Sequence, residues 1–338
     1  MPRALRLFVV GLLAVSMLAG GSVAAQAKGT APKAKKCPER LLILSAMPVE
    51  LDPFFADLDL ERTVEINERR FFVGRLKGNR VILAMTGIGT RNAEQTTTDA
   101  LGHFRCGKQS AVGGIVFSGV AGGDWIGDVA VPTEWTDDFG KTFYPADPAM
   151  LAVASEVAQP GAVSLTQDVH AGDPTCKCKD IPELTTVSAV RIEHVPQVVV
   201  GGKGTTSDPF NGRRLPCFPE GGDVFGCDPC KMRREDPPDA AAFATGIAPF
   251  IDPAFFTGYF EAPPEADPQY KSQDMESGTV ARVAQANGKP FIAFRGVSDG
   301  QGDPLNLPGF PFQFFAYRTI SAENAAAATL AFLERWAA

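Results

Sequence analysis

Two stretches in the C-terminal third of the chain place carboxylates where an α/β sheet would bind a ligand. Met275-Glu276 opens a helix of small residues, and the apolar strand that follows ends on Ser298-Asp299. Ligands of such sheets lie at the carboxyl ends of the strands, so a carboxylate there is placed to act on one as an acid or a base. Glu50 adds a third carboxylate, shortly after the first apolar run.

Each of these groups also has a purely structural interpretation. Glu50 suits the first turn of a helix, where the helix dipole favours a negative charge. Asp299 precedes Gly300 and suits a turn, while Glu276 suits a helix cap. Ser118 and Ser298 suit tight packing, because their side chains are small.

The elements that must position these groups alternate between strand and helix. Apolar runs predict strands at 40–46, 71–76, 80–85, 114–117, 127–131 and 197–201, and helices at 92–104 and 321–336. Lys77-Gly78-Asn79 is expected to be a hairpin turn, and Ser118 to Gly123 a loop of small residues. The alternation indicates an α/β fold with a mixed central sheet, covered by the Ala-rich C-terminal helix.

Short motifs follow one another along the chain in a familiar order. They are Ala46-Met47 followed by Glu50, Gly87-Ile88-Gly89 before a helix, Ser118 to Gly123, Gly127-Asp128-Val129, Ser207-Asp208-Pro209-Phe210, Met275-Glu276 and Ser298-Asp299. This order resembles the purine nucleoside phosphorylase and nucleosidase superfamily, most of all its methylthioadenosine/adenosylhomocysteine nucleosidase branch. The resemblance covers 40–210 and 273–336, and it implies a single-domain, three-layer sandwich with helices on both sides of the sheet.

The resemblance also implies a reaction. It is hydrolysis of the N-glycosidic bond of a purine nucleoside or a 5′-modified adenosine, with no cofactor and no metal ion. Asp299 would protonate the leaving base, and Glu50 would activate the water, as a pair of carboxylates does in glycoside hydrolysis. Glu276 would bind the ribose hydroxyls, Met275 would pack on the sugar, and Phe210 would stack on the purine. The remaining substrate-binding candidates are Ser118, Gly119, Ser298, Gly87 and Ile88.

Two other functions are compatible with the same motifs. A nucleoside phosphorylase would use phosphate instead of water, and Gly87-Ile88-Gly89 at a helix N-terminus would be the place to hold it. Arg91 and Arg295 are the only arginines near the motifs that could assist. A nucleoside-binding or storage-type protein would need the fold but neither Glu50 nor Asp299.

The N-terminus predicts export. A short basic head, an apolar run from Leu7 to Ala19 and small residues before Ala27 are typical of a signal peptide at 1–27. A flexible leader at 28–36 would follow, and then one domain at 37–338. No later apolar stretch is long enough to cross a bilayer. We therefore expect a secreted or periplasmic protein that leaves the membrane once the signal is cleaved, compatible with a homodimer. The net charge of −7 argues against a nucleic-acid partner.

Seven cysteines occur in the exported part: Cys37, Cys106, Cys176, Cys178, Cys217, Cys227 and Cys230. Export favours disulfide bonds, with one thiol left over because the count is odd. Cys37–Cys106 is the first predicted pair, and Cys217, Cys227 and Cys230 are expected to staple an insertion at 211–267 that is rich in Pro, Gly and Cys. Cys227-Asp228-Pro229-Cys230 has no second such motif, and the three histidines lack ligand spacing, which disfavours zinc.

Overall fold

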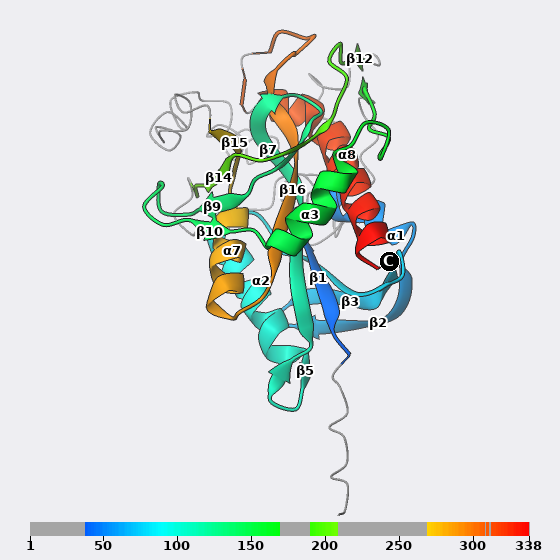
Figure 1. Cartoon of the computed structure of the whole chain (residues 1–338), viewed down its shortest axis with the longest axis vertical. Coiled ribbons are helices and arrows are strands. Elements are labelled where there is room, and N and C mark those ends of the chain that lie inside the picture. The colour runs from blue at the N-terminus through cyan, green and yellow to red at the C-terminus, as the bar shows by residue number, and fades with distance from the viewer. Residues whose placement is uncertain (1–37, 170–189, 209–268, 308, 311, 338) are drawn as a thin grey trace, which may run out of the picture. The chain divides into compact units, whose positions relative to one another are not determined.

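A mixed β-sheet with helices on both faces organises the chain (Figure 1). The computed structural model describes residues 38–169, 190–208, 269–307, 309–310 and 312–337. The predicted signal peptide, the leader, Phe210 and the insertion at 211–267 lie outside these residues. No helix in the described ranges is long and apolar enough to cross a membrane.

The described strands are β1 (Arg40–Ser45), β2 (Asp59–Ile66), β3 (Arg69–Leu76), β4 (Asn79–Met85), β5 (Arg105–Cys106), β6 (Gln109–Ser110), β7 (Val112–Trp125), β8 (Val129–Val131), β9 (Glu134–Thr136), β10 (Tyr144–Pro145), β11 (Asp168–Val169), β12 (Val190–Arg191), β13 (Val198–Val200), β14 (Lys203–Thr206), β15 (Tyr270–Asp274) and β16 (Phe291–Gln301). The described helices are α1 (Pro48–Phe55), α2 (Thr90–His103), α3 (Pro148–Val157), α7 (Ser277–Ala286) and α8 (Phe312–Trp336).

Parallel strands form the centre of the sheet. β1 pairs in parallel with β4 and β7, and β7 pairs in parallel with β16. β2 and β3 extend one side as an antiparallel meander from β4. On the other side β15 runs antiparallel to β7 and parallel to β14. The mixed sheet flanked by helices confirms the predicted fold class.

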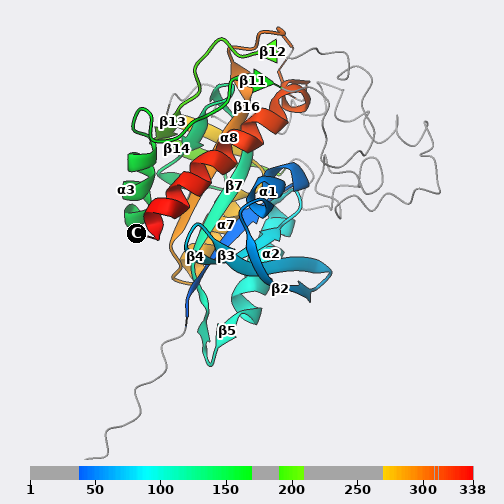
Figure 2. The ribbon, with the colours of Figure 1, turned by 90° about the vertical axis from the view of Figure 1, so that its right-hand side faces the viewer.

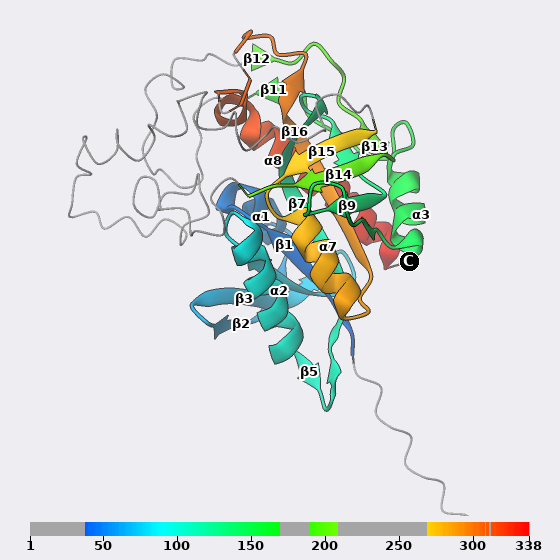
Figure 3. The ribbon, with the colours of Figure 1, turned by 90° about the vertical axis from the view of Figure 1, so that its left-hand side faces the viewer.

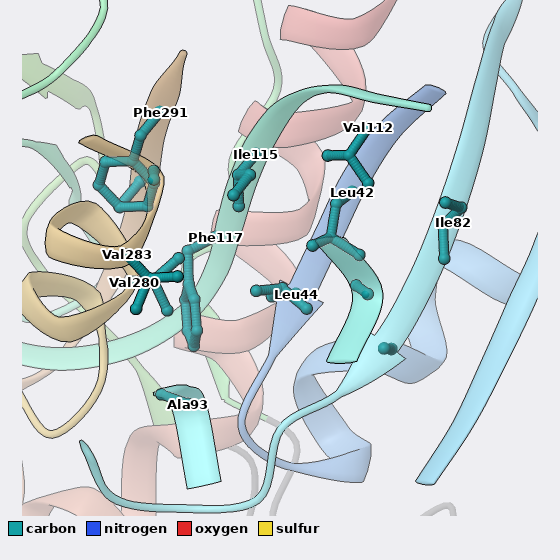
Figure 4. Close-up of a cluster of buried hydrophobic side chains, with 14 of the residues drawn as sticks. Leu42, Leu44, Ile82, Ala93, Val112, Ile115, Phe117, Val280, Val283 and Phe291 are labelled. Carbon is teal, nitrogen blue, oxygen red and sulfur yellow. The ribbon is translucent and has the colours of Figure 1, made fainter. Parts of the chain in front are cut away.

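The two faces of the sheet carry separate apolar cores, because side chains alternate along a strand. Leu42 and Leu44 of β1 face α2 and α7, in the cluster drawn in Figure 4. Leu41 and Ile43 of the same strand face the opposite way, into the core beneath α1, α3 and α8. Figure 2 shows α8 lying along the second face, and Figure 3 shows α2 beside α7 on the first.

The hairpin between β3 and β4 turns where the sequence predicted it. Lys77 and Gly78 both have positive φ values, 47° and 80°. Two such residues in succession match the twist of a two-residue hairpin, a conformation that glycine adopts without strain.

Three boundaries differ from the predictions. Ser118 to Gly123 was expected to be a loop but continues strand β7, because its small residues allow other chain segments to approach the strand on both sides. β16 does not stop at Ser298-Asp299 but runs to Gln301, with a register shift on each side of Asp299. α8 begins at Phe312 instead of Ser321, and β2 was not predicted.

Cys106 lies on the short β5–β6 hairpin and is an exposed, free thiol. This finding contradicts the predicted Cys37–Cys106 bridge: the strand that carries Cys106 projects its side chain into solvent. The other cysteines lie outside the described residues.

Candidate active site

Glu50 is held at the carboxyl end of β1, where α1 begins. Its side chain is 1% exposed. Oε2 accepts hydrogen bonds from the amides of Ala46 and Met47, at 2.7 and 2.9 Å, and Oε1 accepts one from the amide of Val120 at 2.7 Å. A proline at the first position of α1 fixes the chain direction there, so the carboxylate folds back over the helix start.

Arg295 lies opposite Glu50 on β16 and is also 1% exposed. Its Nη2 donates to the carbonyl oxygen of Val120, and its guanidinium carbon lies 4.8 Å from the centre of the Phe117 ring. Its Nη1 donates no hydrogen bond to any described residue, although it is buried. A buried guanidinium N–H without an acceptor is costly, so this atom is a candidate to bind substrate or water.

Two further carboxylates meet the same guanidinium. Asp274 Oδ2 lies 3.2 Å from Arg295 Nε, and Glu276 Oε2 lies 3.4 Å from Nη2. Glu276 Oε1 accepts a hydrogen bond from the amide of Gly89 at 2.8 Å. The turn from β15 into α7 is fixed by Asp274, whose Oδ1 accepts hydrogen bonds from the hydroxyl of Thr206 and from two amides of the turn.

The approach of these side chains to β7 requires a glycine. A Cβ atom on Gly119 would lie 2.6 Å from Glu50 Oε1 and 2.7 Å from Arg295 Nη1. Both distances are shorter than real Cβ contacts, so any side chain there would displace the two charged groups. Gly119 therefore belongs to the site because the absence of a side chain lets Glu50 and Arg295 approach β7.

Asp299 lies further along the same pair of strands. Gly119 pairs with Arg295, and Gly122 pairs with Asp299, so the two groups meet β7 three residues apart, about 10 Å along a strand. Asp299 Oδ2 accepts a hydrogen bond from the Ser298 hydroxyl at 2.7 Å. The amide of Phe314, in the first turn of α8, also donates to this carboxylate. Oδ1 is buried and accepts no hydrogen bond from the described residues.

Burial changes the protonation of all three predicted site carboxylates. Loss of water raises the pKa of Asp299 to about 7, against the lowering effect of its two hydrogen bonds. Burial likewise raises the pKa of Glu276 to about 8; Arg295 opposes this rise, and Asp274 and Glu50 add to it. Burial also raises the pKa of Glu50, against Arg295 and three amide hydrogen bonds. Buried acids with pKa values this high are typical of functional sites.

The structure brings Glu50, Gly119 and Glu276 together around Arg295, with Asp299 nearby on β16. Met275 is half-buried in the turn beside Glu276. Gly87 and Ile88 precede Gly89 in the loop after β4; the Ile88 carbonyl accepts a hydrogen bond from Asn92 at 2.8 Å. The buried Ser298 hydroxyl serves Asp299.

Ser118 is turned away from this cluster. Its hydroxyl accepts a hydrogen bond from Thr329 of α8 at 3.1 Å, on the other face of the sheet. Phe210, the predicted stacking residue, lies outside the described residues.

Arg295 and Asp274 are the site residues that sequence reasoning missed as members of the cluster. Arg295 stands in an apolar strand, which is itself a signal, because a buried arginine needs carboxylate partners. No group of His, Cys, Asp or Glu side chains among the described residues is arranged to hold a metal ion. The carboxylates around Arg295 instead accept hydrogen bonds from backbone amides or lie beside the guanidinium nitrogens.

Comparisons with known proteins show the family and the fold of this chain. The family model of the phosphorylase superfamily matches residues 40–233. The uncharacterized protein Rv2293c of Mycobacterium tuberculosis is 41% identical over 226 residues, which cover 64% of this chain and 88% of that protein. The uncharacterized protein Rv2292c of the same organism is 54% identical over 71 residues, covering 21% of this chain and 96% of that protein.

Solved structures share the fold. One is the 5′-methylthioadenosine/S-adenosylhomocysteine nucleosidase from Neisseria meningitidis in complex with methylthio-immucillin-A, with a TM-score of 0.53 and 18% identity, over 88% of this chain and 99% of that chain. Another is the futalosine hydrolase of Helicobacter pylori strain 26695, with a TM-score of 0.51 and 18% identity, over 88% of this chain and 98% of that chain.

Proposed function

Because the chain belongs to the phosphorylase superfamily, we propose that it is a nucleosidase. It hydrolyses the N-glycosidic bond of a purine nucleoside or a 5′-modified adenosine and releases the free base. The observation that supports this most strongly is that two buried carboxyl groups lie along strand β7: Glu50 of α1 accepts a hydrogen bond from the Val120 amide, and Asp299 of β16 pairs with Gly122. Nucleosidase and futalosine hydrolase structures share its fold.

Asp299 has the properties that a general acid needs. A leaving purine carries the electron pair of the broken bond, and protonation of its imidazole ring neutralises that charge. A carboxyl with a pKa of about 7 is still substantially protonated near neutral pH and can make this transfer. The Ser298 hydroxyl and the Phe314 amide then stabilise the carboxylate that remains.

The cluster around Arg295 suits the sugar. Glu50, Asp274 and Glu276 together place three acidic groups around one guanidinium. The oxygen atoms of these groups would stabilise the positive charge that develops on the ribose as the bond breaks. Glu276, with a pKa of about 8, is largely protonated at neutral pH and can both donate to and accept from ribose hydroxyls.

The arrangement favours water over phosphate as the nucleophile. The amides of Ala46, Met47 and Val120 form the kind of nest that binds an anion, but the Glu50 carboxylate already occupies all three. A phosphate dianion there would meet a carboxylate, while a water molecule could give Glu50 its proton. Arg295 Nη1, which faces the same point near Gly119, is placed to hold that water.

The Gly87-Ile88-Gly89 loop, where a phosphorylase would hold phosphate, already has carboxyl groups bound to it. The amide of Gly89, at the start of α2, donates to Glu276, and Thr90 donates to the carboxylate of Asp208 at 2.9 Å. Because the Gly89 amide is already bonded to Glu276 and the Asp208 carboxylate lies at Thr90, this helix start has little attraction for another anion. The phosphorylase alternative is therefore the weaker of the two enzymatic candidates.

The predicted signal peptide supports the further proposal that this reaction takes place outside the cytoplasm. On that proposal the substrate is a nucleoside met in the periplasm or the medium.

Incubation of the purified protein with a panel of purine nucleosides and 5′-modified adenosines, with and without phosphate, tests the proposal. We expect free base in both buffers, at equal rates, with Asp299→Asn as the inactive control. Turnover that requires phosphate would establish the phosphorylase instead. A protein that binds nucleosides but turns none over would establish the binding function.

A further inference from the structure

The segment between β16 and α8 is built around one carboxylate, Asp303. Its Oδ1 accepts hydrogen bonds from the amide of Leu305 at 2.8 Å and from the hydroxyl of Tyr317. Its Oδ2 accepts from the amide of Leu307 at 2.7 Å and from the side chain of Gln313 at 3.2 Å. Every acceptor direction of Asp303 is therefore used to hold the loop against the first turns of α8.

Tyr317 is a permanent donor in this network. It is fully buried, and burial together with the hydrogen bond to Asp303 raises the pKa of its hydroxyl. The hydroxyl is therefore protonated at neutral pH.

Gln313 connects this network to the strand that carries the proposed acid. Its Nε2 donates to Asp303, and its Oε1 accepts the amide of Gly300 at 3.0 Å. Because an amide has one donor end and one acceptor end, these two bonds fix the orientation of the side chain completely. Gly300 immediately follows Asp299, and Phe314, whose amide donates to Asp299, immediately follows Gln313.

Gly300 is itself tightly confined. A Cβ atom there would lie 2.7 Å from the carbonyl oxygen of Gly123 and 2.9 Å from that of Asp124. The end of β16 is thus pressed against β7 on one side and tied to α8 on the other. Asp299 is enclosed between these two attachments.

We propose that Asp303 and Gln313 are positioning residues for Asp299: they hold the first turn of α8 over its carboxyl group and keep water from it. The proposal rests on the proposed function, because it assigns them a role in the acid step. They touch neither the base nor the sugar in this account and act only through Gly300 and the Phe314 amide.

Charged groups on the neighbouring elements do not supply an alternative explanation. Among the described residues, the causes that shift the pKa of Asp299 are burial, the Ser298 hydroxyl and the Phe314 amide. Asp124 of β7 is paired with Lys271 of β15 at 2.8 Å, and Asp128 is paired with His194 at 2.7 Å. The test must therefore change the burial of Asp299 beneath the first turn of α8.

Gln313→Ala removes both hydrogen bonds and leaves a residue that favours a helix. Because water can then reach Asp299, the pKa of its carboxyl group should fall toward the ordinary value of an aspartate. We expect the alkaline limb of kcat to move to lower pH by about one unit, so that kcat above the limb falls about tenfold. KM and the kcat at pH 5 should each change by less than about threefold, well below the tenfold change expected above the limb.

Asp147→Ala is the matched control. Asp147 also accepts two amide hydrogen bonds, at the start of α3, and its own amide binds Phe291 at the opposite end of β16. The Asp147→Ala variant should be less stable, because a helix cap is lost, but the pH profile of its kcat should not move. A Gln313→Ala profile that stays with the wild-type limb, as the control does, would reduce the network to a structural role and overturn the proposal.

A second variant and a titration test the same positioning effect independently of Gln313→Ala. Tyr317→Phe keeps the buried ring and removes one bond to Asp303, so it should shift the limb in the same direction by less, even if Gln313→Ala fails to fold. Direct titration of the Asp299 carboxyl by carbon NMR measures the same shift without turnover. A protein with no nucleosidase activity but a shifted Asp299 in Gln313→Ala would refute the proposed function and leave the positioning effect standing. An unshifted titration would refute the positioning effect alone.

Discussion

Asp299→Asn should make the protein less active and, at alkaline pH, more stable. The pKa of this carboxyl is raised in the folded state from 3.8 to about 7. A raised acid contributes stability that is complete below the unfolded pKa and is lost as the pH rises through about 7. The asparagine has no such loss, so the stability difference between variant and wild type should grow across that window.

The magnitude follows from the shift. About three pKa units at roughly 1.4 kcal/mol each give about 4 kcal/mol as an upper limit, of which about 3 kcal/mol falls between pH 5 and pH 8. Urea denaturation of both proteins at these two pH values measures it, and the change in the difference cancels any constant effect of the new amide group. Hydrolysis should fall by more than about tenfold, because the amide N–H groups are too weakly acidic to protonate the leaving base. A stability difference independent of pH, together with a smaller loss of activity, would refute the dry-acid interpretation.

Three further predictions concern the rest of the chain. Glu50→Gln should abolish hydrolysis, by about a hundredfold or more, while calorimetry still detects nucleoside binding; turnover within about tenfold of wild type would remove Glu50 as the base. Gly119→Ala should lose turnover and about 1–3 kcal/mol of stability, since its Cβ would meet Glu50 and Arg295, whereas Gly102→Ala on α2, with nothing within 4 Å, should be neutral or slightly stabilising. Secreted material should carry one reactive thiol per chain, at Cys106, with the other six cysteines oxidised; several free thiols in a mass spectrum would contradict the disulfide prediction.

The sequence was sufficient where a local rule decides the structure. The alternation of side chains in β1 follows from the two buried faces of the sheet. The Lys77-Gly78 turn follows from a glycine between two strand-like runs, and both residues have the positive φ values of a tight hairpin. The order of the short motifs was enough to predict the superfamily and its fold.

The sequence was insufficient where the reason lies in a distant segment. The run from Ser118 to Gly123 has the composition of a loop, yet its glycines are needed inside a strand because Glu50, Arg295 and Val297 approach it. The register shifts that let β16 continue beyond Asp299 depend on the packing of α8 and β7, which no local pattern records. Ser118 alternates to the face of α8 once the segment is a strand, which explains its bond to Thr329.

Arg295 shows the same limitation at the site itself. A single arginine in an apolar strand predicts a buried ion pair, but its three acidic partners, from two distant parts of the chain, become visible only in the folded molecule. The same contacts explain why Asp274 serves in place of a longer acid: its carboxylate reaches both the turn amides and the guanidinium.

Hydrolysis in water enriched with oxygen-18 shows whether water or phosphate attacks the anomeric carbon. The wild-type protein, in phosphate-free buffer with the best purine nucleoside of the panel, should release free base and a sugar that carries one labelled oxygen at its anomeric carbon. Mass spectrometry of the sugar at short times, against a control for spontaneous exchange, measures the label. Absence of turnover until phosphate is added, with ribose 1-phosphate as the product, would contradict the assignment of Glu50 as a base acting on water.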